Sequence, residues 1–238
     1  MNDLTTAAAE WIAGDPDPVT RAELQGIVDS GDVEALTERM GATLQFGTAG
    51  LRGRVEAGSN RMNRATVIRA TRGLADYLLA TTGTEQGPVV VGRDARLSSA
   101  TFMDDTIAVL VAAGFKVRYF PDPVPTPLVA YASLHLGGVA AVVVTASHNP
   151  PADNGYKVYA GNGAQIIPPM DSDIAAAIAA VGRASDVPLA EIVGAGAQPI
   201  GDELFADYLL DVAQSLPGTT GDRSISIVYA AMHGVGGK

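Results

Sequence analysis

The sequence contains no cysteine among its 238 residues, which excludes disulfide staples and thiolate metal sites. Basic residues are also few, because 16 lysines and arginines stand against 26 acidic residues and the formal charge is −10. This balance argues against a nucleic-acid-binding protein, which needs a basic surface for phosphates. No apolar run approaches the roughly 18–20 residues of a membrane span, and residues 1–18 do not have the pattern of a signal peptide. We therefore expect a cytoplasmic protein with neither a membrane nor a nucleic-acid partner.

Residues 1–45 predict a helical lead-in. Ala7–Ile12, a segment that starts at Thr20, and Val33–Met40 have helical patterns and are separated by turns rich in Asp, Pro and Gly. Thr20 and Glu23 have the spacing of a capping box, in which the two side chains satisfy free backbone amides at the start of a helix. Nothing in this lead-in indicates chemistry of its own.

From residue 44 onward, short apolar segments alternate with helical ones. The expected strands are Pro88–Gly92, Phe115–Phe120, Val139–Thr145 and Tyr156–Tyr159, and the expected helices are Asn63–Leu79, Ser99–Ala113 and Glu203–Leu210. This alternation predicts an α/β fold, a three-layer α/β/α sandwich with a mixed, largely parallel sheet. Residues 182–199, rich in Gly, Ala and Pro, predict a surface connection.

The last residues predict the start of a second unit. Ile225–Ala230 reads as a fresh strand that runs into a glycine-rich turn, with no following element to cover it. We expect the N-terminal part of a longer protein with three parts: the lead-in at 1–45, a first α/β domain at 46–200, and the start of a second α/β domain at 201–238.

The strongest candidate site is Thr145-Ala146-Ser147-His148-Asn149-Pro150, which directly follows the most apolar strand. Ligands in open α/β sheets collect at the carboxyl ends of strands. A serine on such a turn exposes its hydroxyl beside free backbone amides, an arrangement suited to a phosphate. An ordinary Ser/Asn/Pro turn explains the same composition. A serine hydrolase is excluded because the sequence has no G-x-S-x-G elbow.

Two further segments could handle phosphate. In Phe46-Gly47-Thr48-Ala49-Gly50-Leu51-Arg52-Gly53-Arg54, glycines permit close backbone approach and an arginine offers a bidentate contact, although glycine-rich loops also serve simply as turns. In Asp153-Asn154-Gly155-Tyr156-Lys157, a turn leads into a strand with a lysine near its start, which is otherwise an ordinary surface charge. Neither a Walker motif nor a dinucleotide-binding glycine pattern occurs.

Taken together with V-G-R-D-A-R-L-S-S at 91–99, these segments resemble the α-D-phosphohexomutase superfamily of phosphoglucomutases and phosphomannomutases. T-A-S-H-N-P is similar to the family's phosphoserine loop, F-G-T-A-G-L-R-G to its N-terminal phosphate-site motif, and N-G-Y-K to its lysine segment. The helical lead-in and Arg61-Met62-Asn63 look more like the branch with phosphopentomutase-like and bisphosphate-synthase-like members.

The resemblance implies a phosphosugar mutase that acts on a hexose or pentose phosphate through a phosphoserine and a bisphosphosugar intermediate. Ser147 would carry the phosphoryl group, His148 and Lys157 would transfer protons and orient the reacting oxygens, and Arg52 would support the phosphates. Phosphate and substrate binding would fall to Thr48, Arg52, Asn149 and Lys157.

The resemblance also implies Mg²⁺ and a primer of the glucose 1,6-bisphosphate type. Ser147 would supply one metal ligand through its phosphate, whereas the family's aspartate ligands would lie beyond residue 238. We therefore expect the 238 residues alone to be inactive. Two alternatives remain open: a sugar 1,6-bisphosphate synthase of the same family, and a phosphosugar-binding module without catalysis.

Overall fold

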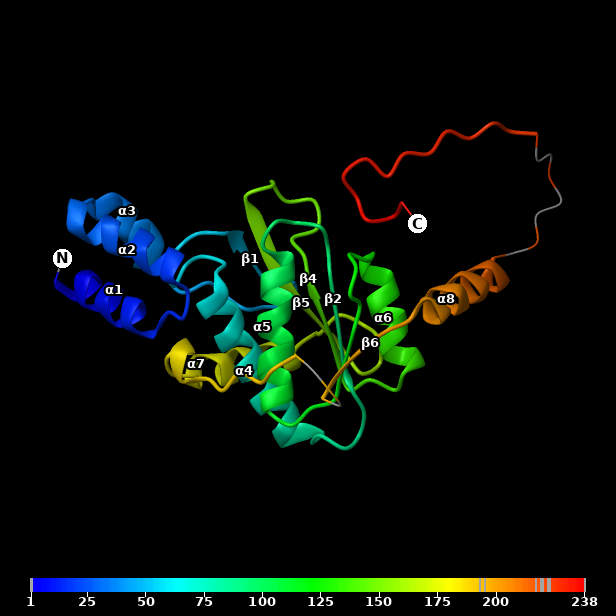
Figure 1. Cartoon of the computed structure of the whole chain (residues 1–238), viewed down its shortest axis with the longest axis horizontal. Coiled ribbons are helices and arrows are strands. Elements are labelled where there is room, and N and C mark those ends of the chain that lie inside the picture. Colours follow the sequence, from blue (N-terminus) through cyan, green and yellow to red (C-terminus); the bar gives the residue numbers. More distant parts are fainter. Residues whose placement is uncertain are drawn as a thin grey trace.

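The computed structural model describes residues 2–192, 194, 196–216, 218, 221 and 224–237. Its centre is a six-stranded sheet with the order β1-β5-β4-β2-β3-β6 (Figure 1). The strands are β1 (Leu51–Arg54), β2 (Val89–Arg93), β3 (Val117–Tyr119), β4 (Ala140–Val144), β5 (Asp153–Ala160) and β6 (Ala197–Pro199). Strands β4, β2, β3 and β6 are parallel neighbours, whereas β5 is antiparallel to both β4 and β1. The predicted mixed, largely parallel sheet is confirmed.

Helices cover both faces of this sheet. One face carries α4 (Arg64–Thr81), α5 (Ser99–Ala112) and α7 (Met170–Ala180), and the other carries α6 (Thr126–His135) and α8 (Asp202–Ser215) (Figure 1). All five residues of β4 are buried, because helices pack on both of its sides. The three-layer sandwich is therefore also confirmed.

Two elements of the sandwich were not predicted. Helix α6 has apolar residues around most of its circumference and opens with Thr126-Pro127, so it shows no clear helical period. Strand β6 falls in residues 182–199, and the expected surface connection is wrong for its three residues. As an edge strand β6 tolerates Pro199, whereas a central position would lose a ladder hydrogen bond.

The predicted helical lead-in is confirmed as α1 (Asn2–Gly14), α2 (Pro18–Ser30) and α3 (Val33–Met40), which share a small core of their own. The expected capping box is wrong. Pro18 occupies the first turn of α2, so Asp17 is the cap and accepts a hydrogen bond from the Val19 backbone N–H. The Thr20 hydroxyl instead donates to the Asp15 carboxylate at 2.6 Å, and Glu23 forms an ion pair with Arg39.

The expected strand Ile225–Ala230 is not formed. No strand is assigned within the described residues 224–237, and the side chains of Ile225, Ile227 and Val228 are exposed. A strand needs a hydrogen-bonded neighbour and a covered face, and this segment pairs with none of the strands in the described part of the chain. Helix α8 precedes it and packs against α6. None of the described helices combines the length and apolar character needed to cross a membrane.

Candidate functional site

The loop after β4 presents Ser147 to solvent. The Ser147 backbone has a φ of 58°, a left-handed conformation that is uncommon for a residue with a side chain. The Thr145 hydroxyl accepts a 2.9 Å hydrogen bond from the Ser147 N–H. Oγ of Ser147 lies 3.4 Å from Nδ1 of the exposed His148. The structure therefore brings the predicted serine and histidine into contact at the carboxyl end of the central strand.

Arg96 holds this loop in place from the turn that follows β2. Its Nη2 donates to the carbonyl oxygens of Ser147 at 3.1 Å and Asn149 at 2.9 Å. Its Nη1 donates to those of Pro150 at 2.7 Å and Asp153 at 2.8 Å. Its Nε donates to the Asp94 carboxylate at 3.1 Å. These contacts engage all five N–H donors of a guanidinium, so the serine loop is built around the Arg96 side chain.

Two asparagines complete the bracing of the loop. Asn149 was expected to bind substrate, and its side-chain amide donates to the Asp153 carboxylate at 2.9 Å within the loop itself. Asn154 is fully buried and donates to the hydroxyls of Ser98 and Ser99 at 2.7 and 3.0 Å. The loop after β4 and the turn after β2 are therefore tied together by side chains on both.

Arg52 and Lys157 lie on the same face of the sheet. Arg52 on β1 is paired with Gly155 on β5, and Lys157 stands two residues farther along β5. Side chains of paired residues, and of residues two apart on one strand, point to the same side. Gly155 leaves room for this arrangement, because a Cβ there would lie 3.2 Å from Cγ of Arg52. The two predicted cations are thus neighbours, beside the strand that leads to the serine loop.

Lys157 has a perturbed amine. Burial lowers its pKa below that of a free lysine, the positive charge of Arg52 lowers it further, and the carboxylate of Asp94 acts in the opposite direction. Nε of Arg52 is itself buried and has no hydrogen-bond partner among the described residues. The pair therefore presents a guanidinium without a bound acceptor next to an amine that releases its proton more readily than usual.

Thr48 is not brought to the serine loop. It lies at the tip of the Gly47–Gly50 turn that precedes β1, and its carbonyl accepts a 2.6 Å hydrogen bond from Gln165, which follows β5. The Ser147 loop adjoins the opposite end of β5, near Asp153. The turn itself requires glycine, because Gly50 has a φ of 77° and a Cβ there would lie 1.9 Å from the carbonyl oxygen of Tyr156.

An open cleft of about 830 Å³ adjoins the serine loop. Its walls come from the loop, the Arg96 turn, the start of α6 and residues 233–235; they include Asp94, Arg96, Leu97, Thr126, Ser147, His148, Asn149 and His233. Small-molecule sites typically measure about 300–1,000 Å³. The cleft is therefore large enough for a sugar phosphate to reach the Ser147 hydroxyl.

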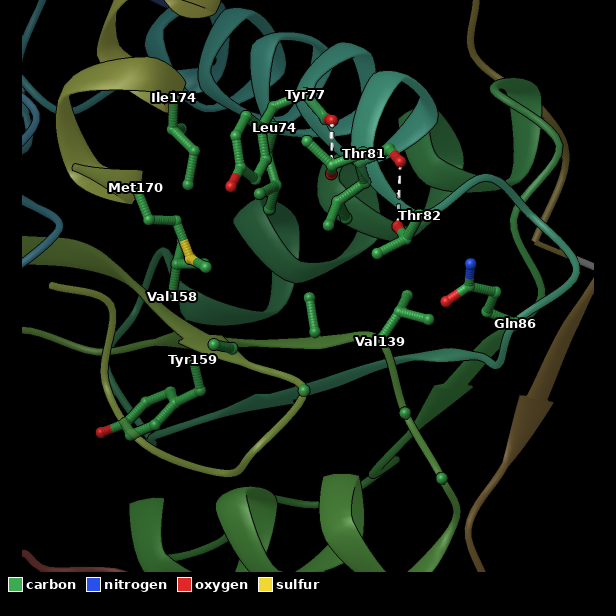
Figure 2. Close-up of a pocket in the computed structure, with 16 residues that line it drawn as sticks. Leu74, Tyr77, Thr81, Thr82, Gln86, Val139, Val158, Tyr159, Met170 and Ile174 are labelled. Atoms are coloured by element: carbon green, nitrogen blue, oxygen red, sulfur yellow. Dashed lines mark hydrogen bonds between the residues drawn. The ribbon is translucent and has the colours of Figure 1, made fainter. Parts of the chain in front are cut away.

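A second cavity, of about 360 Å³, lies at the other end of β4. Figure 2 shows Leu74, Tyr77, Met170 and Ile174 above it and Val139 and Val158 on the sheet side. The Thr81 and Thr82 hydroxyls at its rim donate to the carbonyls of helix α4. Gly137–Ala140, before β4, line this cavity, whereas Ser147 follows β4. None of the described residues that line it is charged, so it lacks groups that could hold a phosphate.

The sequence analysis gave no role to Asp94, Arg96 or Asn154. The V-G-R-D-A-R-L-S-S motif marked the segment, but the contacts of Arg96 with the serine loop join residues 51 to 57 positions apart. Only the sheet order, which places β2 beside β4, brings them together. The motif was thus the available signal, without the contact that explains it.

Comparisons with known proteins agree with this geometry. A sequence model of the family described as "Phosphoglucomutase/phosphomannomutase, alpha/beta/alpha domain I" matches residues 43–184. A "Probable phosphoribomutase" of Schizosaccharomyces pombe is 48% identical over 170 residues, which cover 71% of this chain and 29% of the relative. The mouse proteins named phosphopentomutase and glucose 1,6-bisphosphate synthase are 41% and 40% identical, cover 74% and 72% of this chain, and are each covered over 29% of their own length.

A solved phosphomannomutase structure from Thermus thermophilus has the same fold. It superposes with a TM-score of 0.58 at 29% identity, over 72% of this chain and 36% of that one. The chain therefore spans about a third of the solved structure and 29% of the curated relatives named above.

Proposed function

Because the chain belongs to the phosphoglucomutase/phosphomannomutase family, in its phosphopentomutase-like branch, we propose that it is the phosphoserine domain of a phosphosugar mutase. The whole protein would move a phosphoryl group within a pentose or hexose phosphate. The observation that carries this proposal is the exposed Ser147 hydroxyl, which a fully engaged Arg96 holds over a cleft beside Arg52 and Lys157.

In the proposed reaction, phosphorylated Ser147 gives its phosphoryl group to a hydroxyl of the sugar phosphate. The bond between phosphorus and the Ser147 oxygen breaks, and a bond between phosphorus and the sugar oxygen forms. The resulting bisphosphosugar reorients and returns its other phosphoryl group to Ser147, so that the enzyme is regenerated and the sugar phosphate is isomerised. A glucose 1,6-bisphosphate-type primer would supply the first phosphoryl group.

Two side chains are placed to move the protons. His148 has its Nδ1 3.4 Å from Oγ of Ser147, and would give a proton to that oxygen as its bond to phosphorus breaks. Lys157, whose pKa is lowered by burial and by Arg52, would accept the proton of the attacking sugar hydroxyl. Both protons are exchanged back in the second transfer, so neither side chain is consumed.

Charge compensation falls to the cations on this face of the sheet. A phosphoserine carries roughly −1.5 to −2 charges at neutral pH, and phosphoryl transfer depends mostly on positioning and charge neutralisation. The Arg52 guanidinium, whose Nε has no acceptor among the described residues, would bind a phosphate oxygen. Local cations are needed because the net charge of −10 repels a phosphate at long range.

The described residues do not fit a complete Mg²⁺ site. They contain no group of three or more His, Asp and Glu side chains that could hold a metal ion, and Asp94, near the loop, is already bound to Arg96 and Ser99. A phosphate on Ser147 would add oxygen ligands from a single residue, whereas Mg²⁺ takes near-octahedral coordination by oxygen. We therefore assign no step to a metal.

The experiment that tests this proposal uses the full-length gene product with a pentose or hexose 1-phosphate carrying labelled phosphate. We expect label on Ser147 and interconversion of the two sugar phosphates, both of which the Ser147→Ala variant loses. Turnover by Ser147→Ala at the wild-type rate would contradict the proposal. Binding of the sugar phosphate with no label on Ser147 would favour a module without catalysis.

A second candidate function is sugar 1,6-bisphosphate synthesis, since the mouse glucose 1,6-bisphosphate synthase is 40% identical to this chain. It would use the same serine with another phosphoryl donor. Supplying 1,3-bisphosphoglycerate together with a sugar monophosphate separates the two functions. Net formation of the bisphosphate indicates a synthase, whereas isomerisation that needs only a catalytic amount of bisphosphate indicates a mutase.

A further inference from the structure

A polar hollow lies between the helical lead-in and the α4 side of the sheet. It consists of two cavities, of about 280 and about 540 Å³, that share Trp11, Thr43, Ser59 and Arg69 in their walls. We call this pair of cavities the Trp11–Arg69 hollow. Leu51 lines it, and the neighbouring residue Arg52 points to the opposite face of β1. The hollow is therefore separated from the serine cleft by the sheet.

Arg69 is the first unusual feature of the hollow. Its guanidinium lies 5.6 Å from the centre of the Trp11 ring, and its Nη2 donates to the carbonyl of Val181 at 3.0 Å. Its Nε is buried and has no hydrogen-bond partner within the described residues, and none of their carboxylates forms an ion pair with it. Burial lowers the pKa of Arg69 with no opposing contribution from a carboxylate.

Other arginines of the same region are neutralised. Arg61, at 8% side-chain exposure, pairs with Glu38 and Glu56, and Arg64 at the start of α4 pairs with the buried Asp105. A partly buried cation without such a partner is costly. The contrast indicates that the counter-charge of Arg69 comes from outside the described residues.

Arg183 adds a second cation to the larger cavity. Its side chain crosses the end of α1, since a Cβ on Gly14 would lie 2.9 Å from Cγ of Arg183. It forms no ion pair with the described carboxylates. Glu10 is the one acidic side chain among the described residues that line this cavity. The buried Nε1 of Trp11 also has no acceptor in the described part of the chain.

We propose that the Trp11–Arg69 hollow binds a small organic oxyanion, a carboxylate or phosphate monoester attached to a flat apolar group. The oxyanion would lie between the two guanidinium groups, which bind planar carboxylates and phosphates through paired N–H donors. The flat group would lie along Trp11 and the apolar wall formed by Ala7, Met40 and Ala65. The volume of the larger cavity falls within the usual range for such ligands.

Trp11 supplies the measurement, because it is the only tryptophan in the sequence. Its fluorescence is followed during titration of this 238-residue chain with phenyl phosphate and, separately, with benzoate at constant ionic strength. Inorganic phosphate lacks the flat group, and benzyl alcohol lacks the charge. We expect a saturable change with phenyl phosphate or benzoate, weaker binding of inorganic phosphate and no saturation with benzyl alcohol. The tighter of the two aromatic probes identifies the oxyanion.

Three variants make the test specific. We expect Arg69→Gln and Arg183→Gln each to weaken binding at least about tenfold, which corresponds to about 1.4 kcal/mol. Arg21→Gln removes an exposed arginine from α2, outside the hollow, and should bind as the wild type does. Arg183 is exposed, so its variant remains informative even if Arg69→Gln fails to fold. The proposal is overturned if neither aromatic anion saturates, or if Arg183→Gln and Arg21→Gln bind equally well.

Discussion

Arg96 donates a 3.1 Å hydrogen bond to the carbonyl oxygen of Ser147, a residue 51 positions farther along the chain. Ser147 has the left-handed backbone conformation that an ordinary residue avoids. The remaining donors of Arg96 engage three further carbonyls and the Asp94 carboxylate. The strained serine is thus maintained by a neighbouring strand end, which acts as a rigid support for the reacting hydroxyl.

Replacing Arg96 with alanine should therefore loosen the loop. We expect a loss of about 2 kcal/mol or more in the free energy of unfolding, since hydrogen bonds to charged groups are each worth about 1.5–3 kcal/mol. Hydrogen exchange at the Asn149 amide, which donates to Ala146, should accelerate more than exchange within β2. Arg96→Lys is the charge control and should recover only part of the protection, because an ammonium has three donors and no fork. Unchanged exchange in Arg96→Ala would show that the loop holds itself.

The glycine motif before β1 allows a matched comparison. Gly50→Ala places a Cβ 1.9 Å from the carbonyl oxygen of Tyr156 at a φ of 77°, whereas a Cβ on Gly47 meets nothing within 4 Å. We expect Gly50→Ala to lower the free energy of unfolding by more than about 2 kcal/mol and Gly47→Ala to change it by less than about 1 kcal/mol. Urea denaturation of the two variants measures both. Equal effects would mean that the turn adapts to a side chain at Gly50.

The sequence contained enough to predict the sandwich and the serine loop. Val139–Thr145 is apolar at nearly every position, as only a strand buried on both sides needs to be, and the T-A-S-H-N-P segment follows it directly. Strand β6 was missed because three edge residues beside glycines and a proline have no period. Ile225–Ala230 has the composition of a strand but lacks a neighbour among the described residues. Composition specifies a preference, whereas a strand depends on its partner.

The site divides in the same way. Residue types and motif order brought out Ser147, His148, Arg52 and Lys157, which share one face or one loop. Thr48 belongs to the same motif as Arg52, yet its carbonyl is bound to Gln165 at the other end of β5. Arg96 supports the loop through side-chain contacts with backbone carbonyls, which depend on strand order rather than on sequence spacing. Such contacts become visible only when the sheet is assembled.

Lys157 should titrate below the ordinary lysine value of 10.5. Burial and the nearby Arg52 both disfavour its protonated form, so the neutral, reactive amine appears at lower pH. The measurement is the pH profile of acetylation at Lys157, read by peptide mass spectrometry. Arg52→Gln removes one of the two causes and should move the profile to higher pH. A midpoint at or above 10.5 in the wild type, or a shift to lower pH in Arg52→Gln, would contradict this assignment.

Asp15 gives a prediction about stability. The residue is 2% exposed, and burial raises its pKa despite hydrogen bonds from Thr20 and Asp17. A carboxyl group with a raised pKa in the folded state costs stability as the pH rises from the unfolded value of 3.8 through the folded value. Asp15→Asn removes this cost and should equal or exceed the wild type in stability at neutral pH. Its advantage should vanish as the pH falls toward 3.8, and an advantage that instead grew at acidic pH would reverse the assignment.

The central claim is that Ser147 carries the phosphoryl group. The most direct test incubates the full-length protein with glucose 1,6-bisphosphate and examines the peptide that contains Ser147 by mass spectrometry. We predict an added mass of about 80 Da on that serine, its loss when excess sugar monophosphate is supplied, and no added mass in Ser147→Ala. A full-length protein that interconverts sugar phosphates while Ser147 never acquires phosphate would contradict the claim.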